Sequence, residues 1–443
     1  MRYHFTNLLP LLLGIALCCL GFGCSNSEYT EGTGWEDIIA SHDQNDSAGS
    51  STTKLNYLPL DDSEYPYAGI PRIVIVTENY REINDRETEI PAKLQIWGEN
   101  APESEIMDLT IRGRGNSSWG FPQKSYKIEF LAKQSMLGMP KDRDWALIAN
   151  YADKTLMKNY LAYYLSAKLD AYYAPRCEFV ELYVNRNYLG VYLLTETIKQ
   201  AKHRVNIPNN DSAYLVEVDR KYRKTEQVVF SHEITQDSIG IPFRVHFPKD
   251  ISEHSLHAIE DHIKSFEIFL KDSSKTSPNL NQWIDIDEYI KHYWVQEFAK
   301  NPDADFHTSV FFSWFANSVI RMGPVWDFDL SFGGYDMENI NSPEKWHLKN
   351  PYWNSYIFNN PTMKQARAYY WNLNREQFIT TLKVIDSVQS SLNGAAENNF
   401  KRWNILQSTN FRYHTHSYQK YKDATDDLKK WIQERIQWID SHL

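Results

Sequence analysis

Apolar residues alternate with polar ones, or form short β-branched runs, along most of the first half of the chain. This spacing is typical of strands that are buried on one or both faces. The predicted strands are 70–76, 92–97, 108–112, 124–130, 144–149, 214–218, 310–315 and 319–326, and residues 179–184 and 189–195 form a predicted hairpin.

Helical spacing of apolar residues replaces this pattern in the second half of the chain. It predicts helices over 251–270 and 284–298 and over most of the chain beyond residue 365. An earlier helix is predicted over 156–169, with Asp153 as its N-cap. Strands therefore dominate the N-terminal part and helices the C-terminal part, which predicts an α+β fold and is compatible with two lobes.

The first 24 residues have the pattern of an export signal. A weakly basic start precedes an apolar run over 8–20 that is short for a membrane-spanning helix. A small residue before Cys24 is typical of bacterial lipoproteins, in which this cysteine is lipidated; an ordinary secretory signal is the alternative. Residues 25–65 are polar and predict a flexible tether, so the folded domain is expected over 66–443.

Composition and charge limit the kinds of molecule that the protein could bind. The formal charge of −10 and the lack of a basic block argue against nucleic acid. Aromatic residues make up 14% of the chain, which fits a large core and also fits surfaces that bind carbohydrate. Cys177 is the only thiol after Cys24, so the domain must be stabilised without an internal disulfide.

A glycine-rich loop over 112–123 joins two of the predicted strands. Its three glycines allow a sharp turn in which several backbone N–H groups meet one anion. Lys124 or Lys127 follows at the start of the next strand. A glycine-rich loop followed by a strand lysine suits a nucleoside triphosphate, although such a loop is more commonly a plain turn.

A pair of carboxylates lies much later in the chain. Asp327 and Asp329 are two residues apart in the predicted strand 319–326 or just beyond it, and on an extended backbone they would share a face. Paired carboxylates suit the Mg²⁺ or Mn²⁺ ion that accompanies a nucleotide. The alternative is a turn that caps a helix.

Five segments together carry a resemblance to a known family. Residues 112–128, 144–159, 183–196, 301–305 and 323–333 are similar to the motifs, in order, of the CotH (spore coat protein H) family of kinase-like proteins. The resemblance covers roughly 68–440. It implies a diverged bilobal protein-kinase-like fold and an atypical protein kinase activity, which in some members acts on Ser-rich coat or surface proteins.

On the nucleotide side, the resemblance implies that Lys124 contacts the α- and β-phosphates, with Lys127 as the runner-up. Glu196 would border the nucleotide or, equally, serve as an acid in the first turn of a helix. The residues of the implied phosphate loop are Arg112, Gly113, Gly115, Asn116 and Ser117.

On the acidic side, the resemblance implies that Asp303 orients a Ser or Thr hydroxyl and accepts its proton. Asp327 matches the family's metal-binding aspartate, and Asp329 is a neighbouring ligand. One departure matters: Thr308 occupies the position, five residues after Asp303, where protein kinases have a metal-binding Asn.

The sequence therefore favours an exported, membrane-anchored kinase that uses ATP and Mg²⁺ or Mn²⁺ and acts on exported or surface proteins. Because of Thr308, the alternative is an inactive pseudokinase that serves as a surface module for proteins or glycans. Transfer of another group, such as nucleotidyl, also stays open. A carboxylate-based glycosidase is disfavoured, because it would give the glycine loop and the lysine no role.

Overall fold

The computed structural model describes residue 60 and residues 62–443, apart from 236, 273–278, 349–351 and 415. Cys24, the predicted signal segment and most of the predicted tether lie outside these residues. Among the described helices, none combines the length and the apolar character needed to cross a membrane.

Seven strands of the N-terminal part close into a barrel. The order around it is β1-β2-β3-β4-β5-β7-β6, and β6 closes the barrel by pairing in parallel with β1. Side chains alternate between the barrel interior and its surface, so one apolar cluster fills the inside. The strands are β1 (Arg72–Thr77), β2 (Ile90–Trp97), β3 (Met107–Arg114), β4 (Ser125–Gln134), β5 (Asp142–Ala149), β6 (Cys177–Val184) and β7 (Asn187–Glu196).

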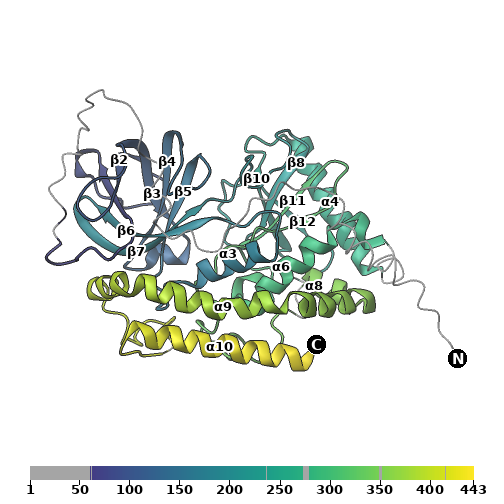
Figure 1. Ribbon diagram of the computed structural model, residues 1–443. Coiled ribbons are helices and arrows are strands. Elements are labelled where there is room, and N and C mark those ends of the chain that lie inside the picture. Colours follow the sequence, from purple (N-terminus) through teal and green to yellow (C-terminus); the bar gives the residue numbers. More distant parts are fainter. Residues whose placement is uncertain (1–59, 61, 236, 273–278, 349–351, 415) are drawn as a thin grey trace, which may run out of the picture. The chain divides into compact units, whose positions relative to one another are not determined.

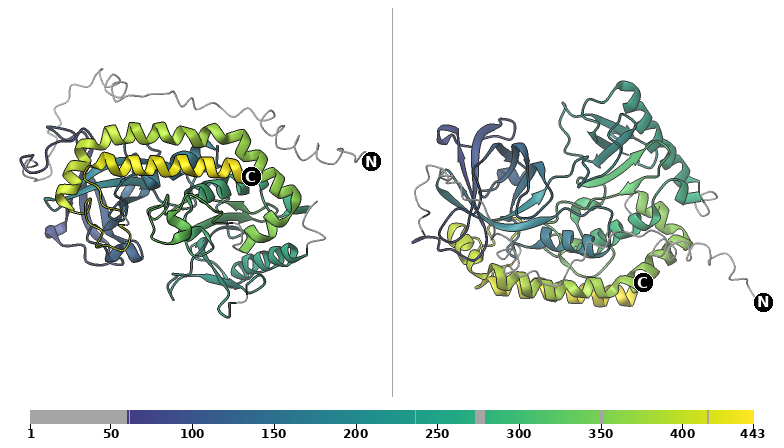
Figure 2. Two further views of the ribbon diagram at one scale, coloured as in Figure 1. Left: turned by 90° about the horizontal axis from the view of Figure 1, so that it is seen from below. Right: turned by 45° about the horizontal axis from the view of Figure 1, so that its top comes forward.

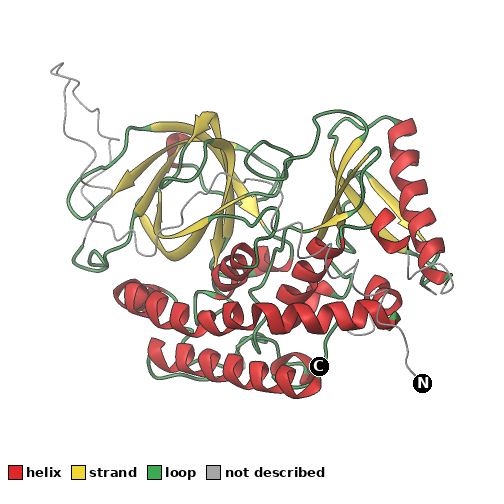
Figure 3. Cartoon of the chain, turned by 45° about the vertical axis from the view of Figure 1, so that its right-hand side comes forward, coloured by secondary structure: helices red, strands yellow, loops and turns green. Residues whose placement is uncertain are grey.

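Five further strands form a second sheet with the order β12-β11-β8-β10-β9. All of its pairings are antiparallel, and β8 is its central strand. Figure 3 shows the two groups of strands apart from each other, with helices below them. The strands are β8 (Ala213–Val218), β9 (Val228–Ser231), β10 (Ile241–Phe247), β11 (Val310–Phe315) and β12 (Arg321–Met322).

The helices pack against the sheet and beneath the barrel. They are α3 (Lys158–Lys168), α4 (Glu253–Lys271), α6 (Ile286–Ala299), α7 (Glu338–Asn341), α8 (Tyr352–Asn359), α9 (Pro361–Arg402) and α10 (Tyr421–His442). The predicted helices are thus confirmed, with one change: the N-cap of α3 is Met157, while the Asp153 carboxylate accepts the Lys158 N–H from further upstream (2.9 Å).

The 42-residue helix α9 connects the two groups of strands. It runs below both in Figure 1, and Figure 2 shows α10 lying alongside it. Near its C-terminal end, Asn399 Oδ1 accepts the Val191 N–H of β7 (3.0 Å). Near its N-terminal end, the Arg367 carbonyl accepts the Trp294 indole N–H of α6 (3.0 Å). The α+β class is confirmed, and barrel closure is a feature that strand spacing did not predict.

The predicted strand 319–326 is mostly wrong. Only Arg321–Met322 forms a strand, β12, and Pro324 offers no backbone N–H to extend the ladder. The chain then turns, and Asp327 adopts a left-handed φ of 67°. Asp327 and Asp329 therefore do not share the face of an extended strand.

A buried ion pair joins α6 to α10. Glu297 and Arg435 are both fully buried, and Arg435 Nη2 lies 2.6 Å from Glu297 Oε1. The same carboxylate accepts the backbone N–H groups of His347 (2.8 Å) and Leu348 (2.6 Å). Arg435 also donates to the carbonyls of Pro343 and Lys345. The pair therefore fixes two helices and the intervening segment 343–348 together.

Removing one partner of this pair should be costly, because the other charge stays buried without compensation. Arg435→Met is expected to lower the free energy of unfolding by about 3–5 kcal/mol, measured by guanidinium denaturation. Lys430→Ala, at an exposed position of the same helix, should change it by less than about 0.5 kcal/mol. A loss below about 1 kcal/mol in Arg435→Met would mean that the backbone donors alone satisfy Glu297.

Candidate functional site

A cleft of about 880 Å³ lies between the barrel and the five-stranded sheet. The barrel contributes the loop after β3 together with residues of β4 and β5. The opposite wall comes from the end of β8, the turn after α6 and the residues after β12. Its charged lining contains Arg86, Arg112, Arg114, Lys127, Asp144, Lys199, Glu217, Asp219, Lys221, Arg223, Arg244, Lys249, Asp303, Asp305, Asp327, Asp329 and Arg412.

Asp303 enters the cleft from a short 3₁₀ turn, η4 (Pro302–Ala304), directly after α6. Asn301 caps this turn, because its Oδ1 accepts the Asp303 N–H (3.2 Å). Burial, followed by the charge of Asp327, raises the pKa of Asp303 to about 7. A carboxyl with a pKa near neutrality is suited to accept a proton during a reaction.

The acidic segment, defined here as residues 326–334, carries the other two predicted acids. Asn301 Nδ2 donates to the Asp327 carbonyl (3.2 Å), and the Ser309 hydroxyl donates to Asp327 Oδ2 (3.4 Å). Burial raises the pKa of Asp327. Burial and the charges of Asp327 and Asp303 also raise the pKa of Asp329. The three acids therefore lie in one region of excess negative charge.

Two acids at the end of β8 extend this region. Glu217 and Asp219 flank Val218 and so project to the same side of the strand. Glu217 accepts the Ser309 N–H (3.1 Å), and its other oxygen contacts His246 Nε2 (2.6 Å). Asp219 accepts the hydroxyl of Thr308 (3.0 Å). Thr308, which departs from the kinase pattern, is thus engaged with a carboxylate.

Basic groups face the acids from the barrel side. Arg114, at the end of β3, stacks on the Trp326 ring at 4.7 Å. Burial lowers the pKa of Arg114, and the charges of Tyr163 and Asp327 oppose that shift. Arg112 also lines the cleft and donates to the Arg86 carbonyl (2.7 Å). An anion in the cleft would meet these guanidinium groups.

The two candidate lysines lie in different environments, and only one of them lines the cleft. Lys127 lines the cleft and forms an ion pair with Asp144 (2.8 Å). Burial alone would raise the pKa of Asp144, but Lys127 and Lys199 outweigh it and lower that pKa to about 2. Lys124 instead donates to the carbonyls of Trp119 (2.7 Å) and Phe121 (3.0 Å) and does not line the cleft.

Some residues of the glycine-rich loop also line the cleft, and others do not. Gly115, Asn116 and Ser117 line the cleft. Gly113 does not, and it has a packing role: a Cβ there would lie 2.3 Å from the Trp119 ring and 2.6 Å from the Asp85 carbonyl oxygen. The close approach of the chain explains why glycine is needed at this position.

Glu196 does not itself line the cleft, although the next residue, Thr197, does. Glu196 is fully buried at the end of β7 and pairs with Arg176 (2.8 Å) and Arg204 (3.3 Å), while the Tyr173 hydroxyl donates to it (3.1 Å). These partners hold Glu196 in buried ion pairs at the end of β7, so it is not an acid in the first turn of a helix. That it borders the nucleotide stays a prediction.

Sequence reasoning missed several charged residues of the cleft, among them Arg114, Glu217 and Asp219. Arg114 lies within the glycine-rich loop motif, but nothing in the pattern separated it from Arg112. Glu217 and Asp219 lie at the end of a buried strand, a position from which polar residues commonly serve a site. Their placement at the end of the strand 214–218 is the signal that would have identified them.

These carboxylates show whether the cleft could hold a divalent cation. No group of three or more His, Cys, Asp or Glu side chains within the described ranges is already close enough to hold a metal ion. Burial is the main cause that raises the pKa of Asp303, Asp327 and Asp329, and the charges of neighbouring acids add to it for Asp303 and Asp329, so a nearby cation would favour their ionised forms. Oxygen ligands of this kind suit Mg²⁺ or Mn²⁺, so the donor set fits, with side-chain movement needed to close it.

The comparison with known protein families covers almost the whole domain. The family model described as CotH kinase protein matches residues 111–439, most of the chain. No curated protein sequence matches the chain. The matched region begins inside β3 and includes the cleft walls from the glycine-rich loop to the acidic segment.

A pH-dependent stability effect is expected from Asp303. Because folding raises its pKa, its contribution to stability is fully present below the unfolded pKa of about 4 and is lost as the pH rises through about 7. Asp303→Asn, which mimics the neutral form, should therefore raise the free energy of unfolding by about 1–2 kcal/mol more at pH 8 than at pH 5.

Denaturant unfolding at the two pH values measures this difference. Asp386→Asn, at an exposed position of α9, serves as the control and should show the same small effect at both. An Asp303→Asn effect that does not depend on pH would contradict the elevated pKa.

Proposed function

The chain belongs to the CotH kinase protein family, and from this premise we propose that it is an atypical protein kinase that transfers the ATP γ-phosphate to Ser or Thr hydroxyls. One observation carries the proposal: the cleft places Asp303, Asp327 and Asp329 opposite Arg114 and Lys127. Acids and basic groups that face the same cleft suit a nucleotide whose phosphates are accompanied by a divalent cation.

Each acid has a separate role in this proposal. Asp303 accepts the hydroxyl proton of the protein substrate, and its pKa of about 7 supports that role. Asp327 and Asp329 would hold Mg²⁺ or Mn²⁺, whose charge would relieve their mutual repulsion. When bound, ATP with its metal ion supplies the phosphoryl group. Asn301 orients both sides, because it caps the Asp303 turn and donates to the Asp327 carbonyl.

The bases orient the phosphates. Lys127 and Arg114 reach the cleft from β4 and β3, and the loop residues Gly115, Asn116 and Ser117 lie beside them. Lys124 is the residue that the family resemblance favours, but it donates to loop carbonyls and does not line the cleft, whereas Lys127, although paired with Asp144 and Glu129, does line it. We therefore assign the phosphate contact to Lys127 and the stabilisation of the loop to Lys124.

The position of Thr308 bears on whether the protein is active. Its hydroxyl donates to Asp219, and we infer that Asp219 supplies the oxygen ligand that a kinase Asn would provide. The second candidate is an inactive pseudokinase that binds protein or glycan at the surface. Thr308 favours this candidate, because it is neutral and already hydrogen-bonded to Asp219. A pseudokinase would show no stabilisation by ATP.

Fold and location complete the proposal. The barrel would correspond to the strand-rich lobe of a diverged bilobal kinase, and the second sheet with its helices to the other lobe. Lipidation of Cys24 after removal of residues 1–23 would anchor the protein to a membrane outside the cytoplasm. Its substrates would then be exported or surface proteins, and nucleic acid would not be a partner.

Thermal unfolding with and without ATP and Mg²⁺ tests the nucleotide site. A ligand that binds only the folded state, at ~100 times its dissociation constant, stabilises by about 2.7 kcal/mol. We expect a metal-dependent rise of the midpoint that is lost in Asp327→Asn and kept in Asp108→Asn, at an exposed position of β3. Transfer from labelled ATP to Ser-rich exported proteins would follow. No shift at millimolar ATP would support the pseudokinase.

The two lysines should respond differently in the same assay. Lys127→Ala is expected to reduce ATP affinity at least tenfold, because it removes a charge from the cleft. Lys124→Ala should lower the midpoint of the ligand-free protein by a few degrees yet retain most of the ATP-induced rise. The reverse result would return the phosphate contact to Lys124.

A further inference from the structure

A short turn over residues 85–88, which we call the brace, lies against the glycine-rich loop. It precedes β2 and also residue 111, where the match to the family model begins. The Asp85 carboxylate closes this turn. Its Oδ1 accepts the N–H groups of Glu87 (2.9 Å) and Thr88 (2.6 Å), and its Oδ2 accepts the Thr88 hydroxyl (2.8 Å). An Asp side chain that bonds the following backbone N–H groups stabilises a turn locally, so the brace has a defined shape of its own.

Three hydrogen bonds join the brace to the glycine-rich loop. The Asp85 carbonyl accepts the Gly113 N–H (2.9 Å), and the Arg86 carbonyl accepts from the Arg112 guanidinium (2.7 Å). The Arg86 guanidinium donates to the Gly115 carbonyl (2.6 Å). Because the C=O of a trans peptide and the N–H of the next residue point in opposite directions, holding this carbonyl also fixes the direction of the next N–H. The conformation of the loop is therefore set in part from outside the loop.

The brace also reaches the opposite wall of the cleft. Glu87 forms an ion pair (2.5 Å) with Arg223, which lies between β8 and β9. The Glu87 side chain is 61% exposed and that of Arg223 is 40% exposed, and Arg86 and Arg223 both line the cleft. The ion pair therefore spans the cleft at its solvent-exposed rim.

On the side of the five-stranded sheet, polar contacts continue from this pair to an acid of the site. The Arg223 N–H donates to Glu226 (2.6 Å), and the same carboxylate pairs with Arg244 (2.7 Å). Arg244 in turn lies 3.4 Å from Asp219, which accepts the Thr308 hydroxyl. An unbroken series of contacts thus leads from the brace to Asp219.

We propose that the brace positions the glycine-rich loop for a phosphate group and couples it to the opposite wall of the cleft. Arg86 is a positioning residue, because its guanidinium is bonded to the loop backbone, and the Glu87–Arg223 pair supplies the link. An exposed ion pair contributes little to global stability. The effect is therefore expected in the order of the loop and in its affinity for phosphates, and not in the unfolding midpoint. This inference rests on the proposed function only for the identity of the ligand.

Hydrogen exchange of the ligand-free protein, followed by mass spectrometry, tests the positioning role. The hydrogen-bonded amides of the loop are those of Gly113, Trp119 and Phe121. Arg86→Ala should speed amide exchange over 113–121 at least fivefold and leave β6 and β7 unchanged. Should this variant fail to fold, Arg86→Lys takes its place; it keeps the charge without the guanidinium geometry and should speed exchange at least twofold. Unchanged exchange in the loop would overturn the proposal.

Charge reversal tests the link across the cleft. Glu87→Arg and Arg223→Glu each place like charges opposite each other, so each should speed amide exchange over 113–121 at least twofold. The double variant restores a pair of opposite charges and should return exchange to the rate of the unmodified protein. Additive effects in the double variant would overturn the link.

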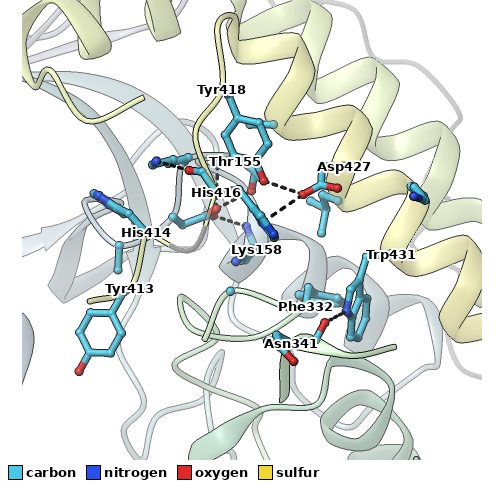
Figure 4. A pocket seen from close by; sticks show the side chains of 18 of the residues that line it. Thr155, Lys158, Phe332, Asn341, Tyr413, His414, His416, Tyr418, Asp427 and Trp431 are labelled. Carbon is cyan, nitrogen blue, oxygen red and sulfur yellow. Dashed lines mark hydrogen bonds and ion pairs between the residues drawn. The ribbon is translucent and has the colours of Figure 1, made fainter. Parts of the chain in front are cut away.

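Asp427→Asn is the matched control for the loss of a charged contact. Asp427 accepts the Tyr418 hydroxyl (2.6 Å) beside a separate cavity of about 210 Å³ between the start of α3 and α10, and Figure 4 shows this contact. None of the described residues that line that cavity belongs to the brace or to the glycine-rich loop. The variant should leave exchange over 113–121 unchanged. An increase as large as that in Arg86→Ala would indicate a general loss of stability and overturn the proposal.

Calorimetric titration with ATP and Mg²⁺ separates this inference from the proposed function. Arg86→Ala should weaken binding at least fivefold, in parallel with its faster loop exchange. Weaker binding without faster exchange in the ligand-free protein would make Arg86 a direct phosphate ligand and overturn the positioning role. If ATP does not bind the unmodified protein, the proposed function fails, while the exchange rates still decide whether the brace orders the loop.

Discussion

The buried Glu297–Arg435 pair is the constraint on which the arrangement of the cleft depends. Glu297 lies in the last turn of α6, and Asp303 follows only six residues later. By joining α10 and the segment 343–348 to this helix end, the pair fixes the point from which the Asp303 turn departs. Desolvation of two charges is expensive, and the backbone donors around the pair offset part of that cost. The pair thus stabilises the region directly beside the site, where the buried acids lower the free energy of unfolding.

Those acids reach the cleft from three separate parts of the chain, and each part is anchored by neutral hydrogen bonds. Asn301 joins the Asp303 turn to the Asp327 carbonyl, Asn159 holds Phe328, and Thr308 engages Asp219. Amides and hydroxyls can fix the backbone without neutralising the carboxylates. The site therefore retains its negative charge in a defined geometry, which is the condition for a strong response to a cation.

The sequence predicted most of the strands and helices, because apolar periodicity is a local property, but it missed β9 and β10 and extended β12 too far. Barrel closure depends on pairing β1 with β6, in which Arg72 lies opposite Glu181, and such distant pairing leaves no local pattern. The family motifs located Asp303 and Asp327, yet their relative placement required the turn at Asp327 rather than a strand. Lys124 and Lys127 were indistinguishable from spacing, because the difference lies in which one has carbonyl acceptors.

The single long helix α9 has a mechanical consequence. It bonds to β7 near one end and to α6 near the other, with no break in its 42 residues. A hinge between the barrel and the sheet would have to bend this helix or release one of its ends. Opening and closing of the cleft should therefore come from the loops at its mouth, and the distance between its walls should vary little between the empty and the loaded protein.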